Sequence, residues 1–200
     1  MIRINTIIFF LIISVSASGN NVRSSAYLFG SIITKTDTIK CYIEHSNSYN
    51  EIVRYKMNLE DKKSLKIDAS LIQKIKISTT VYERISYGNG KSALMKILLS
   101  GEISLYKYTV SSSSSYVYAP GTYYGGRSTE TEKLFLVNKG SVVKAKKRKI
   151  RETLKKLMVY NEEIQVEIEQ FKPSGFQFES SLRTLLSKYN FWYKYEMNNQ

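Results

Sequence analysis

The chain contains one cysteine and one histidine, Cys41 and His45, which are the residue types of a nucleophile and its base. In such a pair the base must lie within hydrogen-bond reach of the thiol, about 2.6 to 3.2 Å. If residues 39–45 form one strand, the two side chains share a face but stand roughly 13 Å apart. Cys41 shares that face with Ile39 and Ile43, which predicts a buried core thiol. We therefore expect no Cys-His catalysis, no intramolecular disulfide and no metal site built from these residue types.

Carboxylates could still hydrolyse a polymer, because a glycosidase needs two of them about 5 to 9 Å apart across a cleft. The acids of the predicted sheet region lie in no recognisable motif, and most fall in predicted turns or beside Lys or Arg. These acids are Asp37, Glu44, Glu60, Asp61, Asp68, Glu83 and Glu102. The pattern favours solvated turn residues, with Asp68 as a local cap, and predicts no catalytic residue, cofactor or metal.

The segment from Lys144 to Lys156, KAKKRKIRETLKK, has eight basic residues and one acid in a chain of net charge +13. Side chains at this density could bind an anionic polymer or a membrane surface. The candidate contacts are Lys144, Lys146, Lys147, Arg148, Lys149 and Arg151. The alternative is a solvated helix face, partly neutralised by the acids of the following segment. Those acids are Glu162, Glu163, Glu167 and Glu169.

A second candidate contact surface is the serine-, tyrosine- and glycine-rich segment 111–128. It begins with five serines and continues as YVYAPGTYYGGRS, which has little periodicity and predicts a long loop. Its candidate contacts are Tyr116, Tyr118, Tyr123, Tyr124 and Arg127. Tyrosine offers broad amphipathic area at low entropic cost, so this loop could contact a protein partner or stack on sugar rings. The alternative is a disordered loop whose tyrosines lie loosely on the sheet.

The first 17 residues have the composition of a cleavable signal peptide. Arg3 precedes the apolar stretch IIFFLIISVSA, and Val15 and Ala17 suit the cleavage site, although a cut after Ser18 or Gly19 fits nearly as well. The apolar run is shorter than the roughly 20 residues of a spanning helix. We therefore predict export to the periplasm, the outer surface or the medium, with no transmembrane segment after cleavage. Export argues against nucleic acid as a partner for the basic segment.

The elements that must position these residues divide into strands and then helices. From 18 to 143, short runs rich in Ile, Val, Tyr and Thr alternate with polar or glycine-containing turns. They predict an antiparallel, meander-like sheet of about eight strands that can curl, with a short loop at Ser100-Gly101-Glu102 joining two of them. Gly88-Asn89-Gly90-Lys91 lacks the phosphate-loop pattern and reads as a hairpin turn.

From 144 to 195 the apolar residues recur at helical spacing, before a polar tail at 196–200. Three amphipathic helices are predicted, the first from about Ala145. Ser174 and Gln177 fit a capping box at the start of the third. The stripe of that helix is Phe178, Leu182, Leu185, Leu186, Tyr189 and Trp192 or Tyr193. The fold class is therefore α+β, with the helical part packed on the sheet.

Three segments carry a resemblance to a known group of proteins. They are the opening GSII with DTIK, residues 30–33 and 37–40, the central MKILLSGEISLYKY, residues 95–108, and LLSKYN, residues 185–190. Together with the signal peptide, this combination resembles small exported proteins of Bacteroidota. The resemblance covers most of the chain after the signal peptide. It implies the fold and export, and it carries over no site residue.

These observations together favour a non-enzymatic, exported envelope protein that binds a protein partner or an anionic or glycan surface. The alternative is a carboxylate-dependent hydrolase of an envelope polymer. The oligomeric state is not readable from the sequence.

Overall fold

The computed structural model describes residues 26–114, 127–172 and 174–197. The expected signal peptide and the four candidate tyrosines, Tyr116, Tyr118, Tyr123 and Tyr124, lie outside these ranges. The described chain forms ten strands followed by helices, so the α+β prediction is confirmed. The strands are β1 Tyr27–Thr34, β2 Thr38–Glu44, β3 Ile52–Lys56, β4 Leu65–Asp68, β5 Ile72–Ile77, β6 Thr80–Tyr87, β7 Lys91–Leu99, β8 Ile103–Ser114, β9 Arg127–Asn138 and β10 Ser141–Lys144.

All ten strands belong to one antiparallel sheet in the order β10-β9-β8-β7-β6-β5-β1-β2-β3-β4. The structure has ten strands where about eight were predicted, and the four-residue strands β4 and β10 form its two edges. β8 and β9 are longer than predicted. Ser111 to Ser114 pair with residues 127–130, although the segment 111–128 was predicted as a loop.

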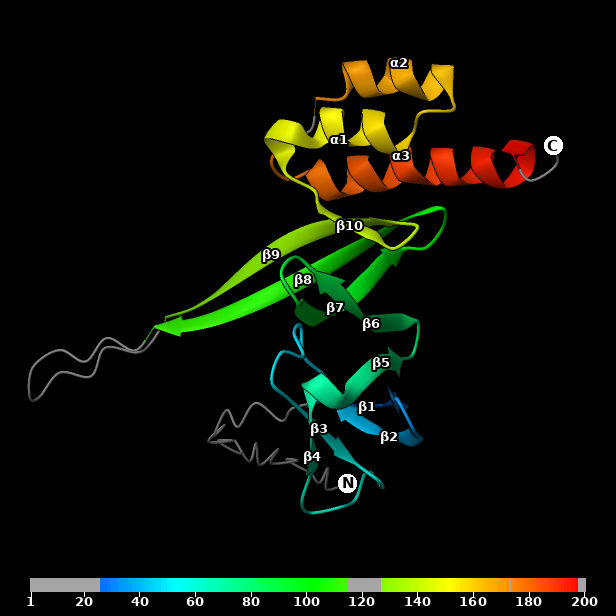
Figure 1. Ribbon diagram of the computed structural model, residues 1–200. Helices are drawn as coiled ribbons and strands as arrows, with labels where there is room; N and C mark the ends of the chain where they lie inside the picture. Colours follow the sequence, from blue (N-terminus) through cyan, green and yellow to red (C-terminus); the bar gives the residue numbers. More distant parts are fainter. Residues whose placement is uncertain (1–25, 115–126, 173, 198–200) are drawn as a thin grey trace, which may run out of the picture.

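The first five strands are curled. β4 and β5 are separated by three strands in the sheet but are joined only by the 3₁₀ turn η1 (Ala69–Leu71). Since neighbouring strands lie about 4.8 Å apart, a flat sheet would hold β4 and β5 roughly 19 Å apart. The four residue steps from Asp68 to Ile72 span at most about 14 Å. The sheet must therefore bend so that β4 approaches β5, as Figure 1 shows.

Two residues hold this bend. The Asp68 carboxylate caps η1 by accepting a hydrogen bond from the Ser70 amide at 2.7 Å, as the sequence predicted. Arg84 on β6 donates from Nε to the Ile72 carbonyl at 2.6 Å and from Nη2 to the Ala69 carbonyl. Its guanidinium thus bonds carbonyl oxygens at both ends of the turn. Backbone oxygens that are removed from water need such partners.

The sheet buries side chains on both faces. The curl of β1 to β5 encloses a first core that includes Ile32, Cys41 and Ile75. A second core of Ala93, Met95, Tyr106 and Phe135 lies on the face of β7, β8 and β9 that points away from the helices. Because side chains alternate along a strand, Leu94 of β7 joins the first core while its neighbours Ala93 and Met95 join the second.

Three helices cover one end of the sheet (Figure 1). They are α1 Ile150–Leu157, α2 Glu162–Gln170 and α3 Phe178–Trp192, followed by a π-helical turn, Tyr193–Met197. The predicted apolar stripe of α3 is buried from Phe178 to Tyr189, while Trp192 and Tyr193 are partly buried. The stripe packs with α1 and α2 against the β8 and β9 side chains. This third core includes Ile103, Leu105, Leu136, Leu154, Ile168, Leu182 and Leu186. In the described part of the chain, none of the helices is both long and apolar enough to cross a membrane.

Two helix starts differ from the prediction. The first α-helix begins at Ile150 rather than near Ala145, because Lys147–Lys149 form a separate 3₁₀ turn. The capping box at Ser174 is wrong. The N-cap of α3 is Gln177, and Ser174 bonds only to the Gln177 side chain at 3.3 Å, because residues 175–177 form a turn outside the helix.

Candidate functional site

Cys41 is a core residue. It is fully buried in the first core, and its Sγ donates to the Ile39 carbonyl at 3.7 Å. Burial raises the pKa of the Cys41 thiol to about 11, so the thiol is neutral at ordinary pH and is a poor nucleophile. His45 follows the end of β2 and is exposed. The prediction of a structural thiol is confirmed.

The acids of the sheet region have local partners instead of a shared cleft. Asp37, Asp61 and Asp68 each accept a hydrogen bond from a nearby backbone amide, at 2.7 to 2.9 Å. Glu44, Glu83 and Glu102 pair with Arg54, Lys74 and Lys139, at 3.9, 2.9 and 3.4 Å respectively. Glu60 is exposed. Among the described residues, no three His, Cys, Asp or Glu side chains come together as metal ligands.

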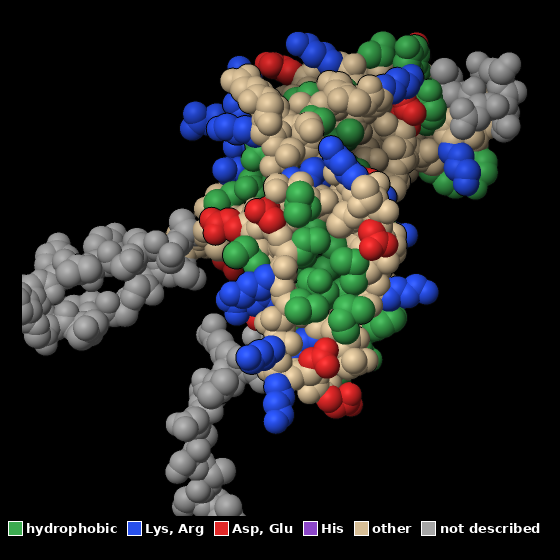
Figure 2. Space-filling view, turned by 60° about the horizontal axis from the view of Figure 1, so that its bottom comes forward, with side chains coloured by type: hydrophobic (Ala, Val, Ile, Leu, Met, Phe, Trp, Pro, Cys, Tyr) green, Lys and Arg blue, Asp and Glu red, His purple; other side chains and the backbone are tan. Residues whose placement is uncertain are grey.

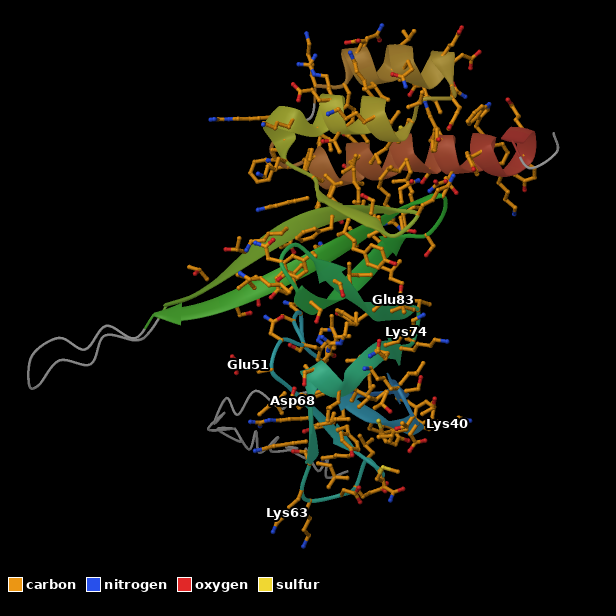
Figure 3. The ribbon with its side chains drawn as sticks, viewed as in Figure 1. Lys40, Glu51, Lys63, Asp68, Lys74 and Glu83 are labelled. Carbon is orange, nitrogen blue, oxygen red and sulfur yellow. The ribbon has the colours of Figure 1, made fainter. Side chains whose placement is uncertain are left out.

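Glu83 has the most specific environment of these acids. It lies beside Lys74 on the adjacent strand, well apart from Asp68 (Figure 3), and it also accepts a hydrogen bond from the Tyr106 hydroxyl at 2.9 Å. Burial raises the pKa of Glu83, but the hydrogen bonds from Lys74 and Tyr106 and the Lys74 charge lower it by more. The net result is a pKa below its ordinary value. Glu83 therefore stays ionised as a structural ion-pair partner.

Two carboxylates that the sequence did not single out do converge. Lys107 of β8 faces the helices, and its Nζ lies 3.3 Å from Oε1 of Glu132 and 3.0 Å from Oε2 of Glu179. The Lys107 side chain is only 19% exposed. Its burial lowers its pKa, while the hydrogen bond and charge of Glu179 and those of Glu132 raise it, and the net shift is upward. Lys107 is therefore a charged bridge between β9 and α3.

A sequence signal for Lys107 exists in its strand. It shares a face of β8 with Ile103 and Leu105, which both enter the third core. A cation on an otherwise buried face needs acidic partners, because an unpaired charge is costly to bury. The strand pattern therefore predicts that Lys107 needs acidic partners. Glu132 and Glu179 lie 25 and 72 residues further along the chain, so only the fold identifies them.

Glu132 and Glu179 line an open hollow of about 500 Å³ between β9, β10 and the start of α3. Its walls also contain Lys133, Lys144 and Lys147, and the aromatic residues Phe176 and Phe178. Two of the six predicted basic contacts therefore lie in this hollow. Figure 2 shows Lys and Arg side chains gathering at the end of the helical layer where α1 and α3 begin.

We define the basic corner as Lys144, Lys146, Lys147, Arg148, Lys149 and Arg151. All six residues are exposed, and they run from the end of β10 through the 3₁₀ turn into the first turn of α1. Lys147 donates from Nζ to the Gly175 carbonyl at 3.2 Å, and Arg151 donates from Nη1 to the Glu169 carbonyl at 3.3 Å. Within the described ranges, Lys144, Lys146, Arg148 and Lys149 form no ion pair.

The acids of α2 neutralise the basic corner less than the sequence suggested, because most of them form no hydrogen bond or ion pair with it in the described part of the chain. Glu169 pairs with Lys155, which lies near the end of α1, and Glu167 pairs with Lys188 of α3 at 2.8 Å. Two of the four acids of this segment, Glu167 and Glu169, thus pair with different neighbouring helices. Within the described ranges, the basic corner meets these acids only where Arg151 contacts Glu169, so Lys144, Lys146, Arg148 and Lys149 keep their unpaired charge.

The tyrosine-rich segment contributes little to this description. Its four candidate tyrosines lie outside the described residues, and Arg127 is placed only by its backbone, as the first residue of β9 opposite Ser114 of β8. The candidate contacts of this segment therefore remain a sequence-based prediction.

Fold and site together define an α+β protein with an open, curled antiparallel sheet, a C-terminal helical layer and an exposed basic corner beside a hollow. Comparison with protein-family models, with curated proteins and with solved structures found no match.

Proposed function

We propose that this is an exported, non-catalytic protein of the cell envelope whose basic corner binds an anionic surface component. One observation carries the proposal. Lys144, Lys146, Arg148 and Lys149 are exposed neighbours with no ion pair among the described residues. The anion could be the phosphate of a lipid or glycolipid head group, an acidic polysaccharide or a teichoic-type polymer. The proposed export, and the resemblance to exported Bacteroidota proteins, argue for such partners over nucleic acid.

The position of these cations supports an anionic partner. Lys147 to Lys149 directly precede α1, and Lys149 is its N-cap without a side-chain capping hydrogen bond. The N-terminal end of a helix carries partial positive charge, so cations there are disfavoured. Their mutual repulsion adds to this cost. An anion bound at the corner relieves both effects, which gives binding a favourable electrostatic free energy.

The experiment removes four charges that have no ion-pair partner. The variant K144Q/K146Q/R148Q/K149Q should bind a purified envelope fraction more weakly than the unmodified chain, and its binding should depend less on salt concentration. The matched control K35Q/K62Q/K63Q/K66Q removes four exposed charges from the β1 to β4 part and should bind as the unmodified chain does. Equal binding and equal salt dependence of the corner variant and the unmodified chain would contradict the proposal.

The alternative is hydrolysis of an envelope polymer, and one observation favours it. The Glu132 and Glu179 carboxylates both contact Lys107, so their oxygens are no further apart than the sum of two hydrogen-bond lengths, within glycosidase range. However, the Lys107 ammonium occupies the space between them, where a scissile bond would lie. Release of soluble fragments from purified envelope polymer, abolished by both E132Q and E179Q, would establish the hydrolase instead.

A further inference from the structure

Phe176 projects from the molecule beside the basic corner. It is the most exposed large hydrophobic residue of the described chain, with a relative exposure of 106%. It lies in the turn that precedes α3, between Gly175 and the N-cap Gln177. No described side chain covers its ring, so its apolar surface is in contact with water. Exposure of this extent costs free energy that burial in an apolar phase would recover.

The turn that carries Phe176 is fixed at both ends. On one side, Lys147 Nζ donates to the Gly175 carbonyl at 3.2 Å. On the other side, Phe178 is buried in the third core, and Lys147 Nζ lies 5.6 Å above its ring. A residue of the basic corner thus holds the turn directly. Phe176 is presented outward by a fixed support and has a defined position relative to the lysines.

The charged residues near Phe176 belong to the hollow on one side of its ring. Phe176 lines the 500 Å³ hollow beside Lys147 of the basic corner, whose Nζ contacts the preceding Gly175 carbonyl. The two acids of the hollow, Glu132 and Glu179, are both engaged by Lys107. The remaining cations can bind phosphate groups, whereas the neighbouring Phe176 ring has no polar atom.

An aromatic ring that projects beside clustered lysines and arginines is the arrangement by which peripheral proteins bind membranes. The cations attract anionic head groups, and the ring enters the interface between head groups and acyl chains. A soluble polyanion would engage the same cations but would gain nothing from the ring. The exposed ring therefore distinguishes a bilayer from the other anionic partners.

We propose that Phe176 and the basic corner form a membrane-binding surface for an anionic lipid bilayer. Lipid phosphates bind at the lysines and arginines of the basic corner, and the Phe176 ring inserts beside them. This inference rests on the proposed function and names its partner as lipid.

The test measures co-sedimentation of the chain without residues 1–17 with vesicles of phosphatidylglycerol and phosphatidylcholine. F176S should lower the vesicle affinity about tenfold, as expected when one large apolar side chain leaves the interface. The same variant should bind dextran sulfate, a soluble polyanion, as the unmodified chain does. F191S is the matched control, because Phe191 is 66% exposed but lies near the other end of α3. It should bind both probes normally.

A spectroscopic measurement reports insertion directly. Trp192 is the only tryptophan of the chain, so a W192F/F176W variant carries one tryptophan at the proposed insertion point. Its emission should shift to shorter wavelength with phosphatidylglycerol vesicles and should not shift with dextran sulfate. An unchanged emission with vesicles to which this variant is bound would overturn the inference.

The outcomes separate this inference from the proposed function. The lipid role of Phe176 is wrong if F176S binds vesicles as tightly as the unmodified chain does, or if its affinity for dextran sulfate falls as much as its affinity for vesicles. In either case the basic corner can still bind anions. If the unmodified chain binds neither vesicles nor dextran sulfate, both proposals fail.

Discussion

The side-chain amide of Asn190 pairs with both backbone polar groups of Ile103. Asn190 Oδ1 accepts from the Ile103 amide at 2.9 Å, and Nδ2 donates to the Ile103 carbonyl at 2.9 Å. The two residues are 87 positions apart, near the end of α3 and at the start of β8. This pair joins the helical layer to the β7–β8 hairpin.

Replacing Asn190 by alanine should lower the free energy of unfolding by about 2 kcal/mol, because two partly buried backbone groups lose their partner. Urea titration followed by circular dichroism measures this change. S187A is the control, because the Ser187 hydroxyl is exposed and bonds only to the Arg183 carbonyl in its own helix. If N190A lowers the free energy of unfolding no more than S187A does, water replaces the Asn190 amide at the Ile103 backbone without cost.

Gly101 is required because of Asn190. A Cβ added at Gly101 would overlap the Asn190 side-chain amide, so G101A should destabilise the protein by about 1 to 3 kcal/mol. In the N190A background the obstacle is gone, and G101A should cost much less. A double-mutant cycle from urea titrations measures this coupling. Additive effects of the two changes would contradict the proposed contact.

Glu83 should make stability depend on pH in the acid range. Its pKa is lowered from 4.5 in the folded state, so its contribution is complete above the unfolded-state pKa and is lost as the pH falls through the lower folded value. E83Q should therefore be less stable than the unmodified chain, by about 1 kcal/mol near neutral pH. The difference should shrink below about pH 4.5.

Unfolding curves of both proteins across this pH range measure the effect. E60Q is the control, because Glu60 is exposed and has no hydrogen bond or ion pair within the described ranges. A difference between E83Q and the unmodified chain that stays constant down to pH 3 would show that Glu83 is not the titrating group.

The Cys41 thiol should be protected in the folded protein. Because it is fully buried and its pKa is raised to about 11, a disulfide reagent at neutral pH should react with it about a hundredfold or more slowly in buffer than in urea. A C41A/S100C variant moves the single thiol to an exposed loop position and should react rapidly in both conditions. Rapid reaction of the unmodified chain in buffer would place Cys41 at the surface instead.

Sequence reasoning succeeded where the structure depends on local pattern. The loop at Ser100-Gly101-Glu102 joins β7 to β8 as predicted. The predicted hairpin turn after β6 joins β6 to β7, and its residues Gly88, Asn89 and Gly90 all have positive φ angles. The stripe that includes Leu182 and Leu186 is buried as its spacing indicated. Alternation along a strand and a 3.6-residue period along a helix are properties of neighbouring residues, so the sequence carries them directly.

The candidate site was predicted only in part for the same reason. The exposed charge of Lys146, Arg148 and Lys149 follows from composition, because so many neighbouring cations cannot be buried. The hollow, by contrast, depends on residues from β9, β10 and α3. Phe176 appeared in the sequence as one apolar residue in a turn, and nothing local marked it as exposed beside lysines that lie about thirty positions earlier.

The sequence by itself therefore determined the element types, the core thiol and the charge of the basic segment. Only the tertiary structure decided that β5 pairs with β1, that Lys107 bridges Glu132 and Glu179, and that Asn190 meets Ile103. Each of these contacts joins residues far apart in the chain. Their partners are selected by the curl of the sheet and the docking of α3, which arise from the packing of all three cores together and not from any local pattern.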